Sequence, residues 1–211
     1  MTPRVRDMPA PRRAKGLIGP AMAKALAWPF RWALAGLLKA GFRPWHLTVL
    51  SLVGNVAAAW LLLTGRRALP AVVLVAAGLL DVFDGSVARE RGEASRWGAF
   101  LDSTLDRVAD VLVFGALFWS LAGRGHHLAA AFALMALVAS FMVSHLRAEA
   151  EAAGVALTEG MAQRLERYVL LLLGLLIPGA LLPVLALLAA LGVVTACQRG
   201  WSAWRRLSAT T

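Results

Sequence analysis

Six apolar runs, separated by short polar segments, occupy most of the chain from Trp45 to Cys197. A helix needs about 20 apolar residues to cross a bilayer, and we expect each run to form one membrane-spanning helix. The runs cover residues 45–63, 69 up to a polar loop at 91–96, 98–121, 128–146, 168–177 and 181–197. The pattern therefore predicts an all-α polytopic membrane protein with six transmembrane helices.

A different pattern precedes the first run. Between residues 20 and 42, three cations interrupt the apolar residues, and tryptophans that favour a membrane interface lie among them. The cations are Lys24, Arg31 and Lys39. We expect an N-terminal amphipathic helix on the membrane surface, kinked at Pro29. Residues 1–19 are basic and proline-rich without a long apolar core, so a disordered tail is predicted there instead of a signal peptide. Residues 20–211 are predicted to form one membrane domain.

The composition also indicates a membrane protein. The chain is 59% hydrophobic with a mean hydropathy of +0.67, whereas a soluble domain is near half apolar. The formal net charge is +10, but the basic residues lie outside the apolar runs, which leave no room for a soluble nucleic-acid-binding core. Membrane lipids and an anionic substrate are therefore the expected partners, and nucleic acid is not. The single cysteine, Cys197, excludes an intramolecular disulfide.

Basic residues are distributed unequally between the two ends of the predicted spans. One end contains most of the arginines, together with both termini and an aspartate-rich segment. The loops at the other end contain only Arg66, Arg67 and Arg124, besides His126 and His127, for which we expect a solvated turn. Because cytoplasmic loops are enriched in Lys and Arg, we expect a cytoplasmic-membrane protein with both termini and the aspartates on the cytoplasmic side.

Four carboxylates lie at the facing ends of the second and third runs. Asp81 and Asp84 are three residues apart, and Asp102 and Asp106 are four apart, so each pair shares one face of its helix. Ionisable groups at such depth cost roughly 2.5–3.5 kcal/mol each and usually mark a functional site. Four facing carboxylates repel one another unless a cation lies between them, and hard divalent cations with oxygen ligands meet that need.

Written as a pattern, residues 81–106 read Asp-x2-Asp-Gly-x2-Ala-Arg-x8-Gly-x3-Asp-x3-Asp. This resembles the signature of the CDP-alcohol phosphotransferase family, and every defining position is occupied. The resemblance implies transfer from a CDP-linked lipid with release of CMP. It further implies that Asp81, Asp84, Asp102 and Asp106 hold two Mg²⁺ or Mn²⁺ ions, and that Asp106 is the catalytic base that accepts the proton of the attacking hydroxyl.

The resemblance also implies a set of nucleotide-binding residues. They are Gly85, Arg89 and Ser95 within the pattern, and Pro44, Trp45 and Thr48 at the start of the first span. Family members tend to carry Pro-(Asn or Asp)-x-x-Thr at the start of the first span. This chain keeps the proline and the threonine but has Trp45 at the polar position. Trp45 either stacks on the cytosine or anchors the helix at the interface, and both interpretations stay open.

Arginines near the cytoplasmic ends of the last three spans indicate an anionic acceptor. They are Arg147, Arg164, Arg167 and Arg199. Arginines from separate helices beside a metal site suit a sugar or polyol phosphate, although an arginine at a span end can also simply snorkel. The surrounding residues resemble the bacterial phosphatidylinositol phosphate synthases, which join inositol 1-phosphate to CDP-diacylglycerol. The resemblance implies that Arg147, Arg167 and Arg199 bind the acceptor phosphate, and Glu149 replaces a residue that is commonly basic there.

Alternatives remain at this stage. Glycerol 3-phosphate as acceptor would use the same arginines. A cation transporter would explain the carboxylates, but it would leave the glycines and Arg89 of the pattern without a role, and the carboxylates lie at one membrane face and not at the midplane. Asp110 either belongs to the site or pairs with a structural partner such as Arg107. The family resemblance further implies a homodimer.

Overall fold

The computed structural model describes residues 19–157 and 164–208, and every regular element among them is an α-helix. The helices are α1 (Gly19–Lys39), α2 (Pro44–Leu63), α3 (Ala68–Glu90), α4 (Arg96–Ala122), α5 (His127–Ala152), α6 (Arg164–Leu176) and α7 (Leu181–Ser208). The predicted all-α class is confirmed within these residues. The predicted tail at 1–19 lies outside them, except for Gly19.

Among the described residues, four helices are long and apolar enough to cross a membrane: α2, α3, α5 and α7. The 27-residue α4 carries charged residues along its first half. The 13-residue α6 rises only about 20 Å, which is less than the roughly 30 Å hydrocarbon core of a bilayer. Length and composition therefore mark the protein as a membrane protein with four candidate spans.

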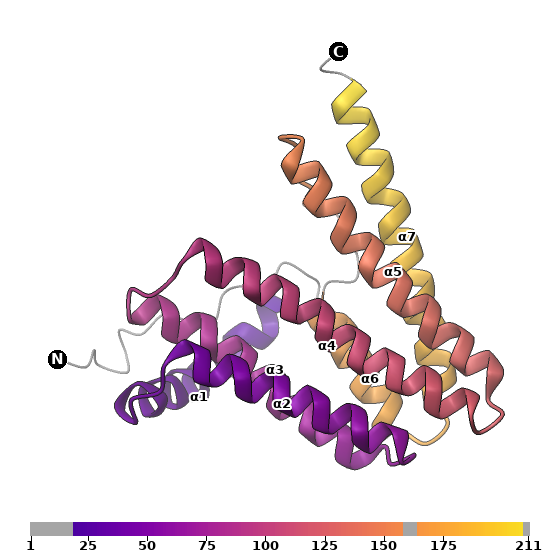
Figure 1. The fold of residues 1–211 in the computed structure, drawn as a ribbon, viewed down its shortest axis with the longest axis horizontal. Coiled ribbons are helices and arrows are strands. Elements are labelled where there is room, and N and C mark those ends of the chain that lie inside the picture. The colour runs from indigo at the N-terminus through magenta and orange to yellow at the C-terminus, as the bar shows by residue number, and fades with distance from the viewer. Residues whose placement is uncertain (1–18, 158–163, 209–211) are drawn as a thin grey trace.

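The helices form two packed groups (Figure 1). In the first, α2 packs against both α3 and α4, and α1 contacts α3. In the second, α5 packs along α7, and their C-terminal halves project beyond the rest of the bundle. Contacts of α4 with α5 and of α6 with α3 and α7 join the groups. The turns before α3, α5 and α7 lie together at the end opposite this projection.

The first helix is tied to the bundle by its aromatic residues. Phe30 stacks on Phe83 of α3 with ring centroids 4.7 Å apart. Phe30 and Leu34 are buried in a small core that also contains Leu47 of α2 and Val87 of α3. Pro29 lies inside the helix, and the kink at this residue stays a prediction. This contact holds α1 beside the end of α3 that carries the aspartates.

Close helix contact between α5 and α7 depends on Gly192. A Cβ placed on Gly192 would lie 2.7 Å from the Cβ of Ala139, which cannot move without its backbone. We therefore expect Gly192→Ala to destabilise the fold by about 1–3 kcal/mol, the usual cost of overpacking. Gly200→Ala on the same helix is the matched control, because its Cβ would meet nothing within 4 Å. Thermal unfolding of both variants in detergent checks this, and equal melting temperatures would contradict it.

Candidate active site

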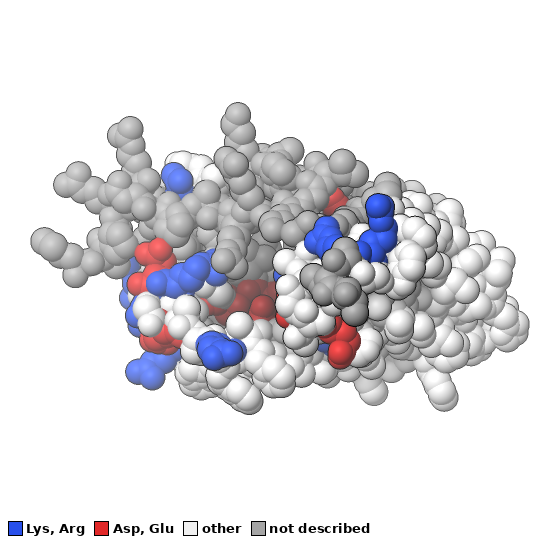
Figure 2. Space-filling model, turned by 90° about the horizontal axis from the view of Figure 1, so that it is seen from above, with Lys and Arg blue, Asp and Glu red and all other residues white. Residues whose placement is uncertain are grey.

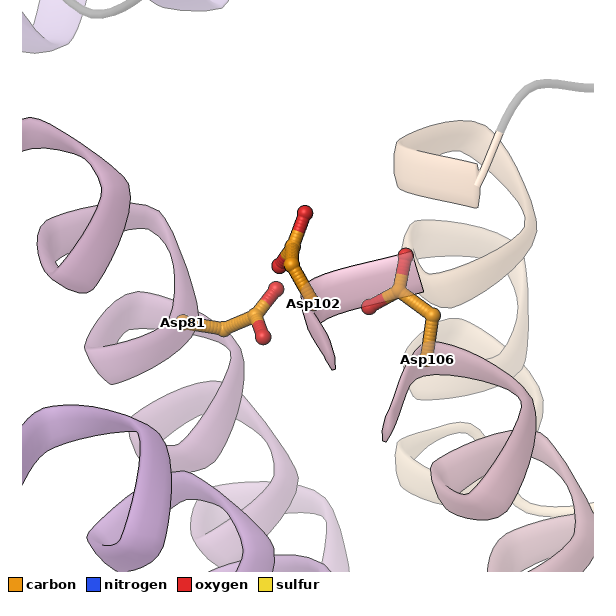
Figure 3. Close-up of side chains that lie close together, drawn as sticks. All are labelled: Asp81, Asp102 and Asp106. Carbon is orange, nitrogen blue, oxygen red and sulfur yellow. The ribbon is translucent and has the colours of Figure 1, made fainter. Parts of the chain in front are cut away.

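Three carboxylates from two helices converge at the end of the bundle near the α3–α4 turn (Figure 3). Asp81 comes from α3, and Asp102 and Asp106 come from successive turns of α4. One carboxylate oxygen from each lies within 4.8 Å of the other two. A cavity of about 10 Å³ beside them is lined by polar atoms of Thr48, Ser51 and Asn55 of α2 as well as by two of the carboxylates.

The arrangement fits a divalent cation. Three carboxylates at this separation repel one another unless positive charge lies between them. They offer only oxygen ligands, which Mg²⁺ and Mn²⁺ prefer, and the small cavity has room for a single ion or water. No histidine or cysteine belongs to this group, so a softer zinc-type site is not indicated among the described residues.

Asp84, the fourth predicted ligand, lies outside this triplet. Its carboxylate is buried, and Thr48 Oγ1 donates a hydrogen bond of 2.6 Å to Asp84 Oδ2. The same hydroxyl lies 3.1 Å from the carbonyl of Pro44. A hydroxyl has one proton, and the shorter, charge-assisted bond to the carboxylate is the stronger of the two. Thr48 therefore holds Asp84 at the edge of the triplet and ties α2 to α3 there.

The predicted nucleotide-binding residues are spread around the same end of the bundle. Arg89 donates to Ser86 Oγ at 3.0 Å, and a Cβ on Gly85 would lie 3.3 Å from its guanidinium, so the glycine leaves space beside this cation. Ser95 is the N-cap of α4 and accepts a hydrogen bond from Gly98 N at 3.0 Å. Trp45 is exposed, and its ring contacts His46 with centroids 4.0 Å apart. Pro44 is the first residue of α2, where its fixed φ suits a helix start.

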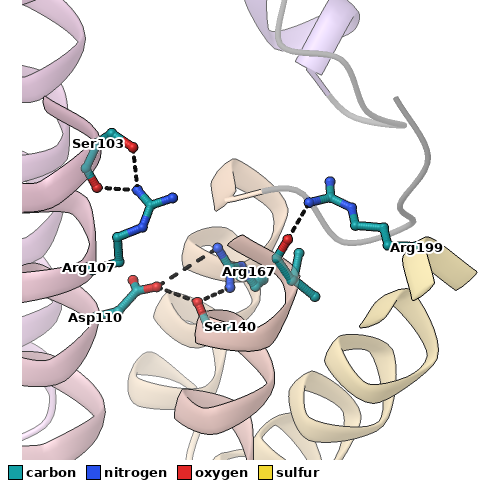
Figure 4. Close-up of polar contacts among 7 residues, drawn as sticks. Ser103, Arg107, Asp110, Ser140, Arg167 and Arg199 are labelled. Atoms are coloured by element: carbon teal, nitrogen blue, oxygen red, sulfur yellow. Dashed lines mark hydrogen bonds and ion pairs between the residues drawn. The ribbon is translucent and has the colours of Figure 1, made fainter. Parts of the chain in front are cut away.

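The predicted acceptor arginines fall into two kinds. Arg167 and Arg199 both approach α5 (Figure 4). Arg199 is buried, and its Nη1 donates to the carbonyl of Val143 at 2.6 Å. Arg147 instead forms an exposed ion pair with Glu151 at 2.8 Å. Arg164 begins α6, but its side chain lies outside the described part of the structure.

Of the two roles that the sequence left open for Asp110, pairing with Arg107 is not what the structure shows. Arg107 Nη1 donates to Ser103 Oγ at 2.7 Å on its own helix, which points it away from Asp110. The partners of Asp110 come from other helices. Ser140 Oγ of α5 donates to Asp110 Oδ2 at 2.5 Å, and Arg167 Nη2 of α6 lies 3.9 Å from the same oxygen. Arg167 also donates to Ser140 Oγ.

Ser140 was not singled out from the sequence, although a polar residue inside a long apolar run is a recognisable signal. It is almost fully buried and closes a three-residue network that joins α4, α5 and α6. Asp110 lies one turn of α4 beyond Asp106, so this network is adjacent along α4 to the carboxylate triplet. Seen from the end at which α5 and α7 project, acidic atoms lie recessed in a hollow with basic residues around it (Figure 2).

Sequence comparison identifies a family model and several relatives that match this chain. The family model of CDP-alcohol phosphatidyltransferases matches residues 42–198. The phosphatidylinositol phosphate synthase of Mycobacterium marinum is 36% identical over 185 residues, which are 83% of this chain and 79% of the relative. The archaetidylinositol phosphate synthase of Methanothermobacter thermautotrophicus is 38% identical over 143 residues, covering 65% of this chain and 70% of its own.

Solved structures of the Mycobacterium tuberculosis phosphatidylinositol phosphate synthase share the fold. The crystal structure with CDP-DAG bound has a TM-score of 0.74 at 36% identity, and the match covers 82% of this chain and 92% of that one. The structure of the same synthase with manganese and citrate has a TM-score of 0.72, with 82% and 87% covered.

Proposed function

The chain belongs to the CDP-alcohol phosphatidyltransferase family, and on that premise we propose that it transfers the phosphatidyl group of CDP-diacylglycerol to inositol 1-phosphate and releases CMP. It is thus a transferase of phospholipid biosynthesis. The observation that carries the proposal is the pairing of two features at one end of the bundle. A triplet of carboxylates lies there, and two arginines from other helices converge on α5 nearby. A diphosphate donor fits the first feature and a phosphorylated alcohol fits the second.

Asp81, Asp102 and Asp106, with Asp84 at their edge, would hold two Mg²⁺ or Mn²⁺ ions. Manganese is present in one of the M. tuberculosis structures. Such ions neutralise the diphosphate and stabilise the leaving CMP. The carboxylates of this chain would fix the positions of the metal ions. The hydrogen bond from Thr48 keeps the Asp84 carboxylate oriented.

Different residues of the chain act on the two substrates, the CDP-diacylglycerol donor and the inositol 1-phosphate acceptor. Asp106 accepts the proton of the attacking inositol hydroxyl, because it is the triplet member nearest along α4 to Asp110 and its arginine. The nucleotide is bound by Gly85, Arg89, Ser95, Pro44, Trp45 and Thr48. The phosphate of the acceptor is bound by Arg147, Arg164, Arg167 and Arg199, whose guanidinium groups present paired donors to phosphate oxygens.

The membrane arrangement we propose has six spans, with α4 and α6 as members of the bundle and α1 lying at the interface. Because the 13 residues of α6 are too few to cross the hydrocarbon core alone, the proposed span there also includes chain outside the helix. Packing against α2 and α5 buries the second half of α4 from Ala109 onward, whereas most of its charged residues lie in the more exposed first half, toward the carboxylate end. The basic residues near the carboxylate end support a cytoplasmic position for that end and for both termini in the proposed arrangement. We further propose that the protein forms a homodimer in the membrane.

The function is tested by offering purified full-length protein CDP-diacylglycerol with labelled inositol 1-phosphate, glycerol 3-phosphate or free inositol, each with Mg²⁺ or Mn²⁺. We expect CMP release and labelled lipid with inositol 1-phosphate only. Product from glycerol 3-phosphate alone would replace the acceptor and keep the reaction class. Absence of CMP release with every alcohol, together with metal-dependent ion flux in vesicles, would favour a cation transporter instead.

The hydrogen bond between Thr48 and Asp84 gives a prediction on the donor side. Thr48→Val keeps the shape of the side chain but leaves a buried carboxylate without its hydroxyl partner. Bonds to charged groups contribute about 1.5–3 kcal/mol, so kcat/KM for CDP-diacylglycerol should fall roughly ten- to hundredfold. Thr48→Ser retains the hydroxyl and should stay within a fewfold of the parent. Steady-state CMP release measures both, and equal losses in the two variants would contradict the role of this bond.

A further inference from the structure

A second cavity lies at the end of the bundle opposite the carboxylates. It has a volume of about 320 Å³ and is formed where the turns before α3, α5 and α7 come together. Its polar wall is made by the side chains of Arg67, His126 and His127, and its apolar wall includes Leu128 and Leu182. None of these residues has a role in the transfer reaction, which takes place at the other end.

The charge around this cavity has one sign. The segments that form this end, residues 60–74, 117–132 and 174–186, contain no Asp or Glu. They contain three arginines and two histidines. In the part of the chain that the structure describes, the acidic residues are all elsewhere, so no carboxylate from these residues neutralises Arg67 at the cavity. The positive charge at this end of the bundle therefore favours an anionic ligand in the cavity.

The side chains of Arg67, His126 and His127 are available to a ligand, unlike that of a neighbouring arginine. Arg124 is engaged by carbonyls, with Nη1 2.9 Å from the Ser120 oxygen and Nη2 3.3 Å from that of Leu63. Among the described residues, the side chains of Arg67, His126 and His127 make no hydrogen bond or ion pair. Arg67 and His126 are the N-caps of α3 and α5, so free backbone N–H groups at the helix starts add to the positive potential of the cavity.

Two tryptophans place the cavity at the depth of lipid headgroups. Trp60 lies one turn before the end of α2 and is 70% exposed, and Trp119 lies one turn before the end of α4 and is 73% exposed. Tryptophan side chains concentrate at the boundary between acyl chains and headgroups. The turns just beyond them therefore lie at phosphate level. On the apolar wall, Leu128 and Leu182 are 61% and 41% exposed, which offers a surface for hydrocarbon.

We propose that this cavity binds an anionic phospholipid of the leaflet opposite the active site. The phosphate lies against Arg67, His126 and His127, and the first carbons of an acyl chain lie against Leu128 and Leu182. The combination of cationic and apolar walls at headgroup depth fits an amphipathic ligand better than a free ion, because a free phosphate would leave the leucines exposed. The site is independent of the acceptor used in the reaction.

The test compares lipid retention between matched variants of the full-length protein. Purified protein in neutral detergent is mixed with equal amounts of phosphatidylglycerol and phosphatidylcholine, and bound lipids are counted by native mass spectrometry. The test variant is Arg67→Gln/His126→Gln/His127→Gln. Arg66→Gln is the control, because Arg66 is the sequence neighbour of Arg67 and does not line the cavity. If the triple variant does not fold, Arg67→Gln alone takes its place.

We expect the parent and Arg66→Gln to retain phosphatidylglycerol in preference to phosphatidylcholine. The test variant should lose at least about fivefold of that preference, the share expected from the charge of Arg67, with unchanged CMP release. Equal phosphatidylglycerol retention in the test variant and in Arg66→Gln would overturn the site. Displacement of the lipid by inorganic phosphate at matched ionic strength would overturn its assignment to a phospholipid.

Discussion

Asp106→Asn should reduce CMP release by at least about a thousandfold while leaving the fold intact. Asp106 contributes one of three carboxylate oxygens that lie within 4.8 Å of one another, and in the proposed reaction it also accepts the proton of the attacking hydroxyl. Loss of a general base alone costs about 10²–10⁴ in rate. The amide cannot accept that proton, and it is a weaker metal ligand than a carboxylate.

The measurement separates chemistry from metal binding. CMP release is followed under saturating CDP-diacylglycerol and inositol 1-phosphate, and Mn²⁺ binding is followed independently by thermal shift of the same protein. We expect the rate to collapse and the Mn²⁺-dependent rise in melting temperature to shrink, because one ligand has lost its charge. Glu93→Gln is the matched control, since Glu93 is an acidic residue of the α3–α4 turn outside the triplet. A rate within tenfold of the parent would remove Asp106 from the role of base.

Hydropathy predicted most helix boundaries closely but missed one start and two ends. The predicted starts at 45, 69, 98, 128 and 181 fall within two residues of the observed ones, whereas α6 begins at Arg164, four residues before the predicted start at 168. The predicted ends at Leu146 and Cys197 are too early, because α5 continues to Ala152 and α7 to Ser208. Apolar runs mark the thickness of the bilayer, whereas a helix continues into water where alanine, glutamate and arginine favour it.

The sequence also predicted some features of the candidate site and missed others, depending on whether they lie within one helix or between helices. Spacing within one helix was sufficient to place Asp102 and Asp106 on a shared face, because the period of an α-helix fixes it. Spacing could not predict which side chains of different helices contact one another. The partners of Asp110 lie 30 and 57 residues away along the chain, and which of them meets it depends on how α4, α5 and α6 rotate against one another. The nearer candidate, Arg107, is four residues from Ser103 and bonds there.

Asp110→Asn should raise the KM for inositol 1-phosphate about tenfold or more and change kcat much less. The Asp110 and Arg167 side chains are only 7% and 13% exposed, and they are joined through Ser140 in a network that fixes the guanidinium of Arg167. Its Nε is buried without a hydrogen-bond partner among the described residues, which leaves a donor for a phosphate oxygen. The 3.9 Å separation of Arg167 from Asp110 is longer than a hydrogen bond, so the carboxylate orients the arginine without occupying its donors.

Removing the charge of Asp110 leaves Arg167 buried without its counter-ion, and truncating one member of a buried pair typically costs 2–5 kcal/mol. Part of that cost falls on stability, so the melting temperature is measured beside the kinetics. A purely structural tie would lower the melting temperature and leave the KM for inositol 1-phosphate unchanged, and that result would contradict a positioning role. Arg107→Gln is the matched control, because Arg107 is three residues before Asp110 on α4 but, among the described residues, its side chain bonds only to Ser103. Its KM should equal that of the parent, whereas Arg167→Gln should raise KM at least as much as Asp110→Asn, since the arginine itself contacts the acceptor phosphate in the proposed reaction.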